Sequence, residues 1–306
     1  MARYLIRRVL QLVPTLIALL LIIFFAVRLL PGDVTDTLGG EYQNAAAVET
    51  IRSSLGLDKP LIQQLGSYFD GLLHGNLGAS LVYGTPVWYL VTGAYPQTLA
   101  LAALALTLAI VLGVSFGVLA AARPNGILDF ASMTVAIAGA AIPVFWLGLV
   151  LVSIFAVSLK WVPAGEIGGL SSYILPTLTL GLPGAGIIAR MTRSEMLEVM
   201  RSEYTMIARS KGISERRILI RYALRNSLLP VITSISLLGG SMLGGSVVVE
   251  TIFTWPGMGH LLIGAVQNRD YPIIQGTLLL YGLSYVLLNF GVDLLYAALD
   301  PRIEYA

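Results

Sequence analysis

The chain of 306 residues contains no cysteine and only two histidines. Without cysteine it can form no disulfide bond, no thiolate nucleophile and no cysteine-based metal site. Charged residues make up 12% of the sequence, where an ordinary soluble domain has roughly 25%. Hydrophobic residues account for 56%. This balance predicts a membrane protein rather than a soluble enzyme.

Motifs for catalysis and nucleotide binding are also missing. No His-Glu-x-x-His pair occurs, and no glycine-rich loop ends in Gly-Lys-Ser or Gly-Lys-Thr. Lys211 precedes Gly212, the reverse of the order that a phosphate loop requires. Glu250 and Asp293 lie near span ends, so no relay of carboxylates at mid-membrane depth is expected. We therefore predict no enzyme, cofactor or metal site in this chain, and a transporter built from it needs an external source of energy.

Long apolar runs dominate what is present. A bilayer span takes about 20 mostly apolar residues, and six runs meet that need: Val9–Val27, Gln97–Ala122, Ala131–Leu159, Ile167–Ala189, Asn226–Val249 and Tyr271–Val292. The sequence predicts an all-α integral membrane protein with six transmembrane helices. A soluble protein is the alternative, but it would need buried helices longer than a small domain can cover.

Basic residues are distributed unevenly between the predicted loops. Nine of the nineteen Lys and Arg residues fall in Arg190–Arg225, and three more precede the first span. Because basic residues favour the cytoplasmic side, this pattern predicts that both termini are cytoplasmic. A cleaved signal peptide is the alternative for the N-terminus. The apolar run is too long for one, and the residues after Ala26 make a poor cleavage site.

The segment between the first two spans, residues 31–97, is predicted to be an extracytoplasmic insert. Leu61–Leu73 has the apolar spacing of an amphipathic helix, which His74–Gly78 is expected to end. Residues 46–55 also have helix-forming composition. We interpret the insert as an ordered cap that receives a partner; a packed loop that only shields the span ends is the alternative. The predicted divisions are residues 1–30, 31–97 and 98–306, the last being a five-helix core.

Three spans have unusual compositions. Pro143 is expected to kink the third, and Pro176 and Pro183 interrupt a glycine-rich fourth. The fourth is a candidate pathway wall, although Gly and Pro are in any case commoner in membrane helices. The fifth is rich in small residues that let helices approach closely. We predict a subunit interface or substrate pathway along Ser236, Gly240, Ser241, Gly244 and Gly245.

Arg190–Arg225 is predicted to be a docking surface on the cytoplasmic side. Apolar residues at helical spacing are expected to share one helix face: Leu197, Met200, Tyr204 and Ile207. Ser202 is the expected N-cap of a short helix, and Gly212 its left-handed end. Ser214 is expected to cap a second helix that leads into the fifth span. Such a unit, joined to a span on each side, can convert a push at the membrane face into span rotation.

An amphipathic helix held at the membrane surface by anionic lipid is the alternative for this segment. Four acids stand among its nine bases, and the glycine ends the helix sharply. Both features favour a protein partner over a lipid surface.

The same segment resembles the coupling loop of ABC importer permeases. The general family pattern is Glu-Ala-Ala, three residues, Gly, and further on Ile-x-Leu-Pro. Ala208 and Gly212 match this pattern, whereas Met206 and Ile207 replace the Glu and the first Ala. These departures resemble the peptide-type branch of the family. Four other stretches are similar to that branch: Leu30–Asp33, Leu55–Pro60, Val249–Gly259 and Arg269–Pro272.

The resemblance covers essentially the whole chain and implies the type I (MetI-like) importer permease fold. It implies a B-type permease in a bacterial plasma (inner) membrane, surrounded by lipid. The implied partners are a homologous C-type permease, two cytosolic ABC ATPases that bind ATP and Mg²⁺, and an extracytoplasmic solute-binding protein, with no nucleic acid. The residues implied in coupling lie at about 202–212: Glu203, Tyr204, Ala208, Arg209, Lys211 and Gly212.

By the same resemblance, the expected function is ATP-driven import of di- or oligopeptides. Glutathione, opines and nickel chelates are alternative substrates of the same class of transporter. An ion-driven secondary transporter, a membrane enzyme and a scaffold protein are other classes. Co-purification with P-loop ATPases would separate an ABC permease from all three.

Overall fold

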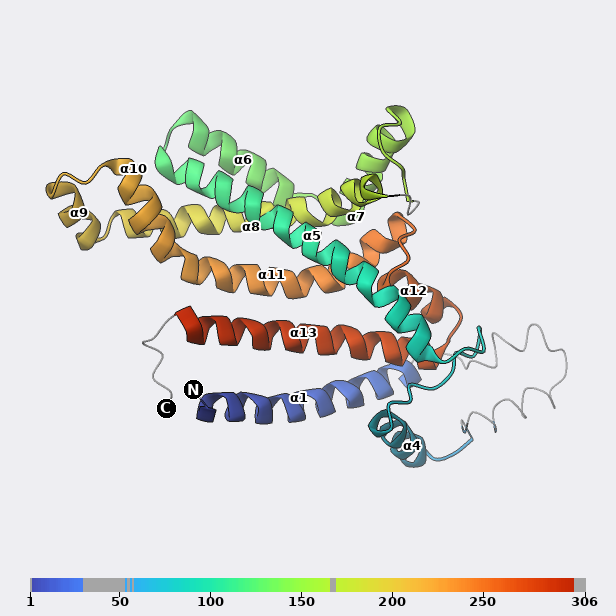
Figure 1. Cartoon of the computed structure of the whole chain (residues 1–306). Coiled ribbons are helices and arrows are strands. Elements are labelled where there is room, and N and C mark those ends of the chain that lie inside the picture. Colours follow the sequence, from blue (N-terminus) through green and yellow to red (C-terminus); the bar gives the residue numbers. More distant parts are fainter. Residues whose placement is uncertain (1, 30–52, 54–55, 57, 166–168, 300–306) are drawn as a thin grey trace. The chain divides into compact units, whose positions relative to one another are not determined.

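The computed structural model describes residues 2–29, 53, 56, 58–165 and 169–299 (Figure 1). Within these residues the chain is helical, apart from turns and an isolated bridge between Ala79 and Pro86. The described helices are α1 (Ala2–Leu29), α4 (Leu61–Leu73), α5 (Val87–Ala122), α6 (Ile127–Ala141), α7 (Val144–Leu151), η1 (Val152–Ser158), η2 (Leu170–Tyr173), α8 (Ile174–Met200), α9 (Glu203–Ser210), α10 (Glu215–Arg217), η3 (Ile218–Leu224), α11 (Arg225–Ile252), α12 (Met258–Gln267) and α13 (Tyr271–Leu299).

Five of these helices are long and apolar enough to cross a membrane, and a bent pair makes a sixth candidate. α1, α5, α11 and α13 contain four of the six predicted spans, and α8 contains another, Ile167–Ala189, only from Ile174 onwards. The predicted all-α membrane fold is therefore confirmed. α5 begins at Val87, so residues 87–97 of the predicted insert belong to this helix. α12 was not predicted.

The third predicted span differs from a single kinked helix. α6 and the α7–η1 helix meet at an angle of 101°. Ile142 ends α6 in an extended conformation, with ψ of 127°, and Pro143 precedes α7. A proline ring clashes with a helical residue before it and supplies no N–H. Pro143 therefore ends one helix and starts another.

The chain divides into two compact units. Of the described residues, the first unit contains those up to Gln97 and residues 256–286, and the second contains those from Thr98 to Trp255 and residues 287–299. The described core of the first unit includes Val27 of α1, Val87 of α5 and Ile273 of α13. α4 has the predicted bounds, which confirms the amphipathic helix. Apart from Ser53, the expected helix at residues 46–55 lies outside the described residues.

A buried carboxylate joins two parts of the first unit. Asp270, immediately before α13, accepts hydrogen bonds from the Ser80 hydroxyl at 2.6 Å and from the Leu81 N–H at 3.0 Å. Buried carboxylates are tolerated when such donors satisfy them. Asp270 thus ties the end of the predicted insert to the start of the last span.

In the second unit, α8 packs against α6, α7, η3 and α11. Its glycines lie where other helices cross it closely. A Cβ at Gly186 would overlap the carbonyl oxygen of Ala136 in α6, and one at Gly181 would lie 2.8 Å from the carbonyl oxygen of Ala105 in α5. Both glycines are buried. Gly181 and Gly186 therefore serve helix packing, and the interpretation of the fourth span as a pathway wall stays a prediction.

Candidate coupling surface

α9 is a separate short helix that follows α8 after a turn at Arg201 and Ser202. α8 ends at Met200, and Ser202 precedes α9 with extended backbone angles of −69° and 154°. The predicted helix start at Ser202 is therefore confirmed. The predicted single face is wrong, since Leu197 and Met200 lie on α8, whereas Tyr204 and Ile207 lie on α9.

The Ser202 hydroxyl does not cap α9 in the usual way. It donates to the carbonyl oxygen of Val199 at 2.5 Å and lies 3.0 Å from the Thr205 hydroxyl oxygen. Thr205 also donates to the Val199 oxygen, at 2.8 Å. The last carbonyls of a helix have no partner within it, and these two hydroxyls satisfy one of them. The hydroxyls thus stabilise the end of α8 and fix α9 against it.

Gly212 ends α9 in the left-handed conformation, with φ of 76°, as predicted. The Ile213 N–H donates to the Ala208 carbonyl at 3.2 Å, and the Gly212 N–H donates to the Arg209 carbonyl at 2.9 Å. This pair of bonds is a Schellman motif. An L side chain adopts this conformation at a cost, so glycine makes the sharp turn between α9 and α10 possible.

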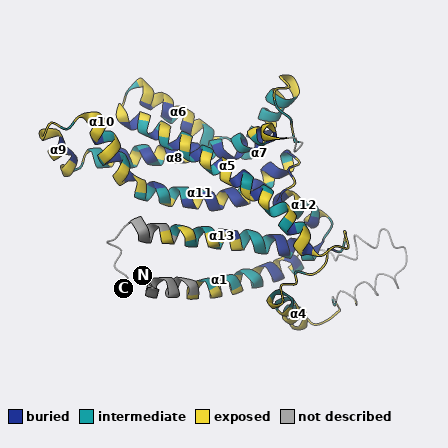
Figure 2. Ribbon diagram, in the orientation of Figure 1, coloured by how far each residue is buried: buried dark blue, intermediate teal, exposed yellow. Residues whose placement is uncertain are grey.

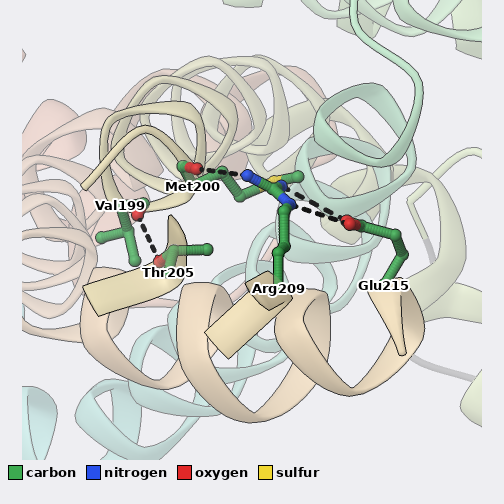
Figure 3. A network of polar contacts seen from close by, with 5 residues as sticks. All are labelled: Val199, Met200, Thr205, Arg209 and Glu215. Carbon is green, nitrogen blue, oxygen red and sulfur yellow. Dashed lines mark hydrogen bonds and ion pairs between the residues drawn. The ribbon is translucent and has the colours of Figure 1, made fainter. Parts of the chain in front are cut away.

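Arg209 connects three elements (Figure 3). Its Nη1 donates to the Met200 carbonyl at 3.2 Å, and its Nε donates to Glu215 Oε1 at 2.8 Å. The hydrogen bond with Glu215 raises the pKa of Arg209 above its usual value. Both side chains are substantially exposed, so the pair stabilises the chain only modestly, by about 0.2–1 kcal/mol. Its geometric role is to hold α8, α9 and α10 in one arrangement.

One side of α9 packs on the chain and the other faces away from it (Figure 2). Thr205 and Ala208, three residues apart, are buried. Tyr204, Met206 and Ile207 are 43%, 66% and 54% exposed. Exposed apolar side chains grouped on one short helix are typical of an interaction surface. We call the exposed residues of α9 the coupling surface: Glu203, Tyr204, Met206, Ile207, Arg209 and Ser210.

The predicted coupling residues occupy different parts of this arrangement. Ala208 lies in the packed side, and Gly212 forms the turn. Glu203 and Tyr204 are exposed at the start of α9, Arg209 forms the ion pair, and Lys211 is exposed at the helix end. The structure therefore brings these residues together on one short helix and its turn.

Four further residues at this site were not predicted as functional. Thr205 and Glu215 hold α9 in place, while Met206 and Ile207 make up most of its exposed apolar area. A signal for the ion pair was available, because a sharp turn at Gly212 brings Arg209 and Glu215 together. Met206 was noted only as a departure from the family pattern, and Ile207 as such a departure and as part of an apolar helix face.

The five small residues of the fifth span do not share one face of α11. Ser236 and Gly240 are buried, and a Cβ at Gly245 would lie 3.5 Å from Leu180 of α8. Ser241 and Gly244 are exposed, with Leu237 and Val248 on the same exposed stripe. Ser236, Gly240 and Gly245 thus serve packing within the second unit. Ser241 and Gly244 remain available to another surface.

Two features of the described residues bear on possible chemistry in this chain. No group of three or more His, Asp or Glu residues among them could hold a metal ion. The prediction that catalytic motifs are missing needs one correction, because Gly113–Gly117 has the Gly-x-Ser-x-Gly pattern of a nucleophile turn, although it lies inside α5. A Cβ at Gly113 or Gly117 would overlap Ile188 or Thr192 of α8. This pattern is a helix-packing feature.

Comparisons with known proteins agree over the whole chain. Residues 113–305 match the family described as "Binding-protein-dependent transport system inner membrane component", and residues 1–102 match its N-terminal counterpart. The chain is 41% identical to the glutathione transport system permease protein GsiC of Pectobacterium atrosepticum and 40% identical to that of Escherichia coli, each over 100% of both chains.

Two solved structures are similar in fold. One is an inward-facing MetNI methionine ABC transporter, with a TM-score of 0.59 and 19% identity over 70% of this chain and 97% of that one. The other is an amino acid ABC transporter, with a TM-score of 0.56 and 14% identity over 68% and 94%. At these identities the likeness concerns the fold alone. Family match, full-length relatives and membrane-spanning helices together show that the chain belongs to the binding-protein-dependent transport system inner membrane components, as a multi-pass permease subunit of an ABC importer.

Proposed function

We propose that this permease subunit carries ATP-driven movement from a cytosolic ATPase into its spans through the coupling surface on α9. The observation that supports this most directly is the two-sided packing of α9. Thr205 and Ala208 face the chain, while Tyr204, Met206 and Ile207 face away from it. An ATPase that binds the exposed side of α9 would move a helix whose other side packs against the rest of this chain.

The contacts of α9 define where such a movement goes. Thr205 and Arg209 connect α9 to the carbonyl groups at the end of α8. Arg209 also connects it to Glu215, from which α10, η3 and α11 continue as one helical stretch of 38 residues. A displacement of α9 therefore acts on two spans at once. ATP and Mg²⁺ belong to the partner ATPases, and this chain supplies only the mechanical connection.

A second, homologous permease subunit completes the pathway in this proposal. The exposed stripe of α11, with Ser241 and Gly244 between Leu237 and Val248, offers a narrow surface of small and apolar groups. Small residues permit close approach of another helix and leave room for a solute. We assign this stripe to the subunit interface or the adjoining pathway. Ser236, Gly240 and Gly245 support it from the packed side.

The proposed orientation places both termini and α9 in the cytoplasm. The excess of basic residues in Arg190–Arg225 supports this arrangement, since such residues are retained on the cytoplasmic side. The insert of residues 31–97 then faces the other side of the membrane. There it contributes to the surface that receives a solute-binding protein.

Small peptides are the proposed substrate class. The peptide-type motifs of the sequence support di- and oligopeptides, and the full-length relatives named as glutathione permeases make that tripeptide the first candidate. Opines and nickel chelates are less well supported. In this class of importer the solute-binding protein selects the substrate, so the permease needs only a compatible pathway.

The test is reconstitution of the complete importer in proteoliposomes with its cognate binding protein. Uptake of glutathione, dipeptides, oligopeptides, an opine and a nickel chelate would be measured with ATP inside the vesicles. We expect uptake of a peptide substrate that requires both ATP and the binding protein. Uptake by this chain alone with an ion gradient would contradict the proposal.

A further inference from the structure

A cavity of about 380 Å³, lined by both polar and apolar groups, lies in the first unit, next to the end of α1. α1, α4, the segment before α5 and the start of α13 all contribute to its wall, and Figure 1 shows α4 beside that end of α1. Two cationic side chains, Arg28 and Lys59, line it. The described lining residues include no Asp or Glu. The described part of the cavity lining therefore carries net positive charge.

Arg28 has neutral partners. Its Nε and Nη2 donate to Gln64 Oε1 at 3.0 and 2.9 Å, and its Nη1 donates to the Phe24 carbonyl at 3.1 Å. The guanidinium also stacks 3.5 Å from the centre of the Phe24 ring. None of these groups is anionic, and the guanidinium has five N–H donors in all. A half-buried cation held by neutral groups alone is costly unless an anion joins it.

Two more donors in the same cavity lack a partner. The Tyr68 hydroxyl and the Gln275 Nε2 are buried and form no hydrogen bond within the described structure. Most buried polar atoms in proteins do have one. Burial raises the pKa of Tyr68 to about 12, against a smaller lowering by the charge of Arg28, so the hydroxyl keeps its proton. Among the described residues, Arg28 thus lacks an anionic partner, and the two donors lack hydrogen-bond acceptors.

We propose that this cavity binds an oxyanion, a phosphate or carboxylate group, with Arg28 as its charge partner and Tyr68 Oη and Gln275 Nε2 as donors. A buried water would satisfy the two donors but would leave the guanidinium without a counter-charge. Lys59, exposed at the cavity, attracts an anion towards it. The volume of about 380 Å³ leaves ample room for such a group, since a single water occupies roughly 30 Å³ of liquid volume.

Two sources can supply this chemistry. Arg28 is the second-last residue of the candidate span Leu10–Leu29, which is the depth of phospholipid headgroups. A phospholipid phosphate can therefore reach the cavity from the bilayer. A soluble anion can reach it from the aqueous side. The chemistry is the same in both cases, and the experiment separates them.

The complete importer, purified in a nonionic detergent and depleted of lipid, would be titrated with inorganic phosphate and with short-chain phosphatidylglycerol. A ligand that binds the native state raises the unfolding temperature, which yields its affinity. We expect Tyr68→Phe to weaken binding about tenfold, as loss of one hydrogen bond does. Arg28→Gln should weaken it about a hundredfold, because it removes a charge-assisted contact.

Tyr68→Phe is the decisive variant. It removes no described hydrogen bond. It also keeps the aromatic ring, whose centre lies 5.7 Å from the centre of the Phe24 ring. If the hydroxyl had no ligand, this change would be neutral or stabilising, and affinities would stay the same. Lys160→Gln, which removes an exposed cation from the second unit, is the charge-matched control and should bind like the wild type.

Each outcome either supports or overturns the proposed oxyanion site. Protection by phosphate as well as by the lipid, weakened in both variants, indicates a site for soluble anions. Protection by the lipid alone, weakened in the same way, indicates a headgroup site. Protection by neither probe, or affinities unchanged in Tyr68→Phe and Arg28→Gln, overturns the proposal. The readout requires no transport, so it is independent of the proposed coupling function.

Discussion

Arg193 in α8 donates from Nη2 to Oδ2 of Asp129 in α6 at 2.6 Å, and the same oxygen accepts the Asn125 N–H at 2.8 Å. Asp129 is buried, and the Arg193 side chain is 27% exposed. The pair lies about two helical turns before the end of α8. It therefore connects the start of α6 to the last part of α8, the helix that precedes α9.

Replacement of Asp129 by Asn should destabilise the protein. The change leaves the Arg193 guanidinium without its described counter-charge, at a cost of about 2–4 kcal/mol. Thermal unfolding of the purified importer measures this loss. Glu215→Gln breaks the exposed pair with Arg209 and should cost less than about 1 kcal/mol. Equal losses in the two variants would show that burial of the Asp129 pair is unimportant.

Replacement of Gly212 by Val should uncouple ATP hydrolysis from transport. Space is available for a side chain, since no atom lies within 4 Å of a Cβ there, so the penalty comes from the backbone. The left-handed conformation costs a β-branched residue about 1–3 kcal/mol, whereas Asn tolerates it. The measurement is stimulation of ATPase activity by the binding protein. We expect it to fall in Gly212→Val and to persist in Gly212→Asn; the same stimulation in both would contradict the proposed role of the turn.

The turn at Gly212 also shows how far sequence reasoning reached. Gly212, Ser202 and the amphipathic pattern of Leu61–Leu73 are local signals, and each predicted a helix boundary that the structure contains. The prediction that Leu197 and Tyr204 share one helix face was wrong, and the reason is local as well. Helical periodicity continues across a short turn without revealing it. In the structure, the extended backbone of Ser202 and the hydroxyls of Ser202 and Thr205, bonded to Val199, mark the break.

Ala208 should tolerate no larger side chain. It lies on the packed side of α9, which contacts α8 and η3. Ala208→Leu adds volume that the packed contact has no room for, at about 1–3 kcal/mol, and it pushes α9 from its position. We expect transport to fall while the spans remain folded. Met206→Leu, which conserves volume on the exposed side, is the control, and comparable transport by both variants would refute the packing argument.

The coupling surface should bind its ATPase through apolar contacts. Ile207→Asp places a charge where a partner would bury an exposed apolar side chain, and loss of one such anchor costs about 2 kcal/mol or more. Co-purification of the ATPase should therefore fall by about tenfold or more. Ile127→Asp introduces the same charge at a residue that is 87% exposed at the start of α6 and should leave co-purification intact. A similar loss in both variants would indicate general damage instead of a docking contact.

Tertiary packing was the part that sequence could not supply. The fifth-span residues Gly240 and Gly244 have the same spacing motif, yet one is buried and the other exposed. Which of them meets a neighbour depends on how α11 is rotated against α8. That rotation follows from side chains on several helices, such as Leu180 and Met242, and no local pattern encodes it.

Gly186 and Gly244 should respond oppositely to the same substitution. Gly186→Ala places a methyl group against the Ala136 carbonyl of α6, so the helices must separate, and we expect a loss of about 1–3 kcal/mol in stability. Gly244→Ala meets no atom within 4 Å and should leave the thermal stability of the isolated subunit unchanged. If the exposed stripe of α11 meets the second permease, the same variant should instead weaken co-purification of that subunit. Wild-type assembly and transport in a bulkier Gly244→Leu variant would remove the stripe from the interface, because a leucine cannot fit where two helices approach through small residues.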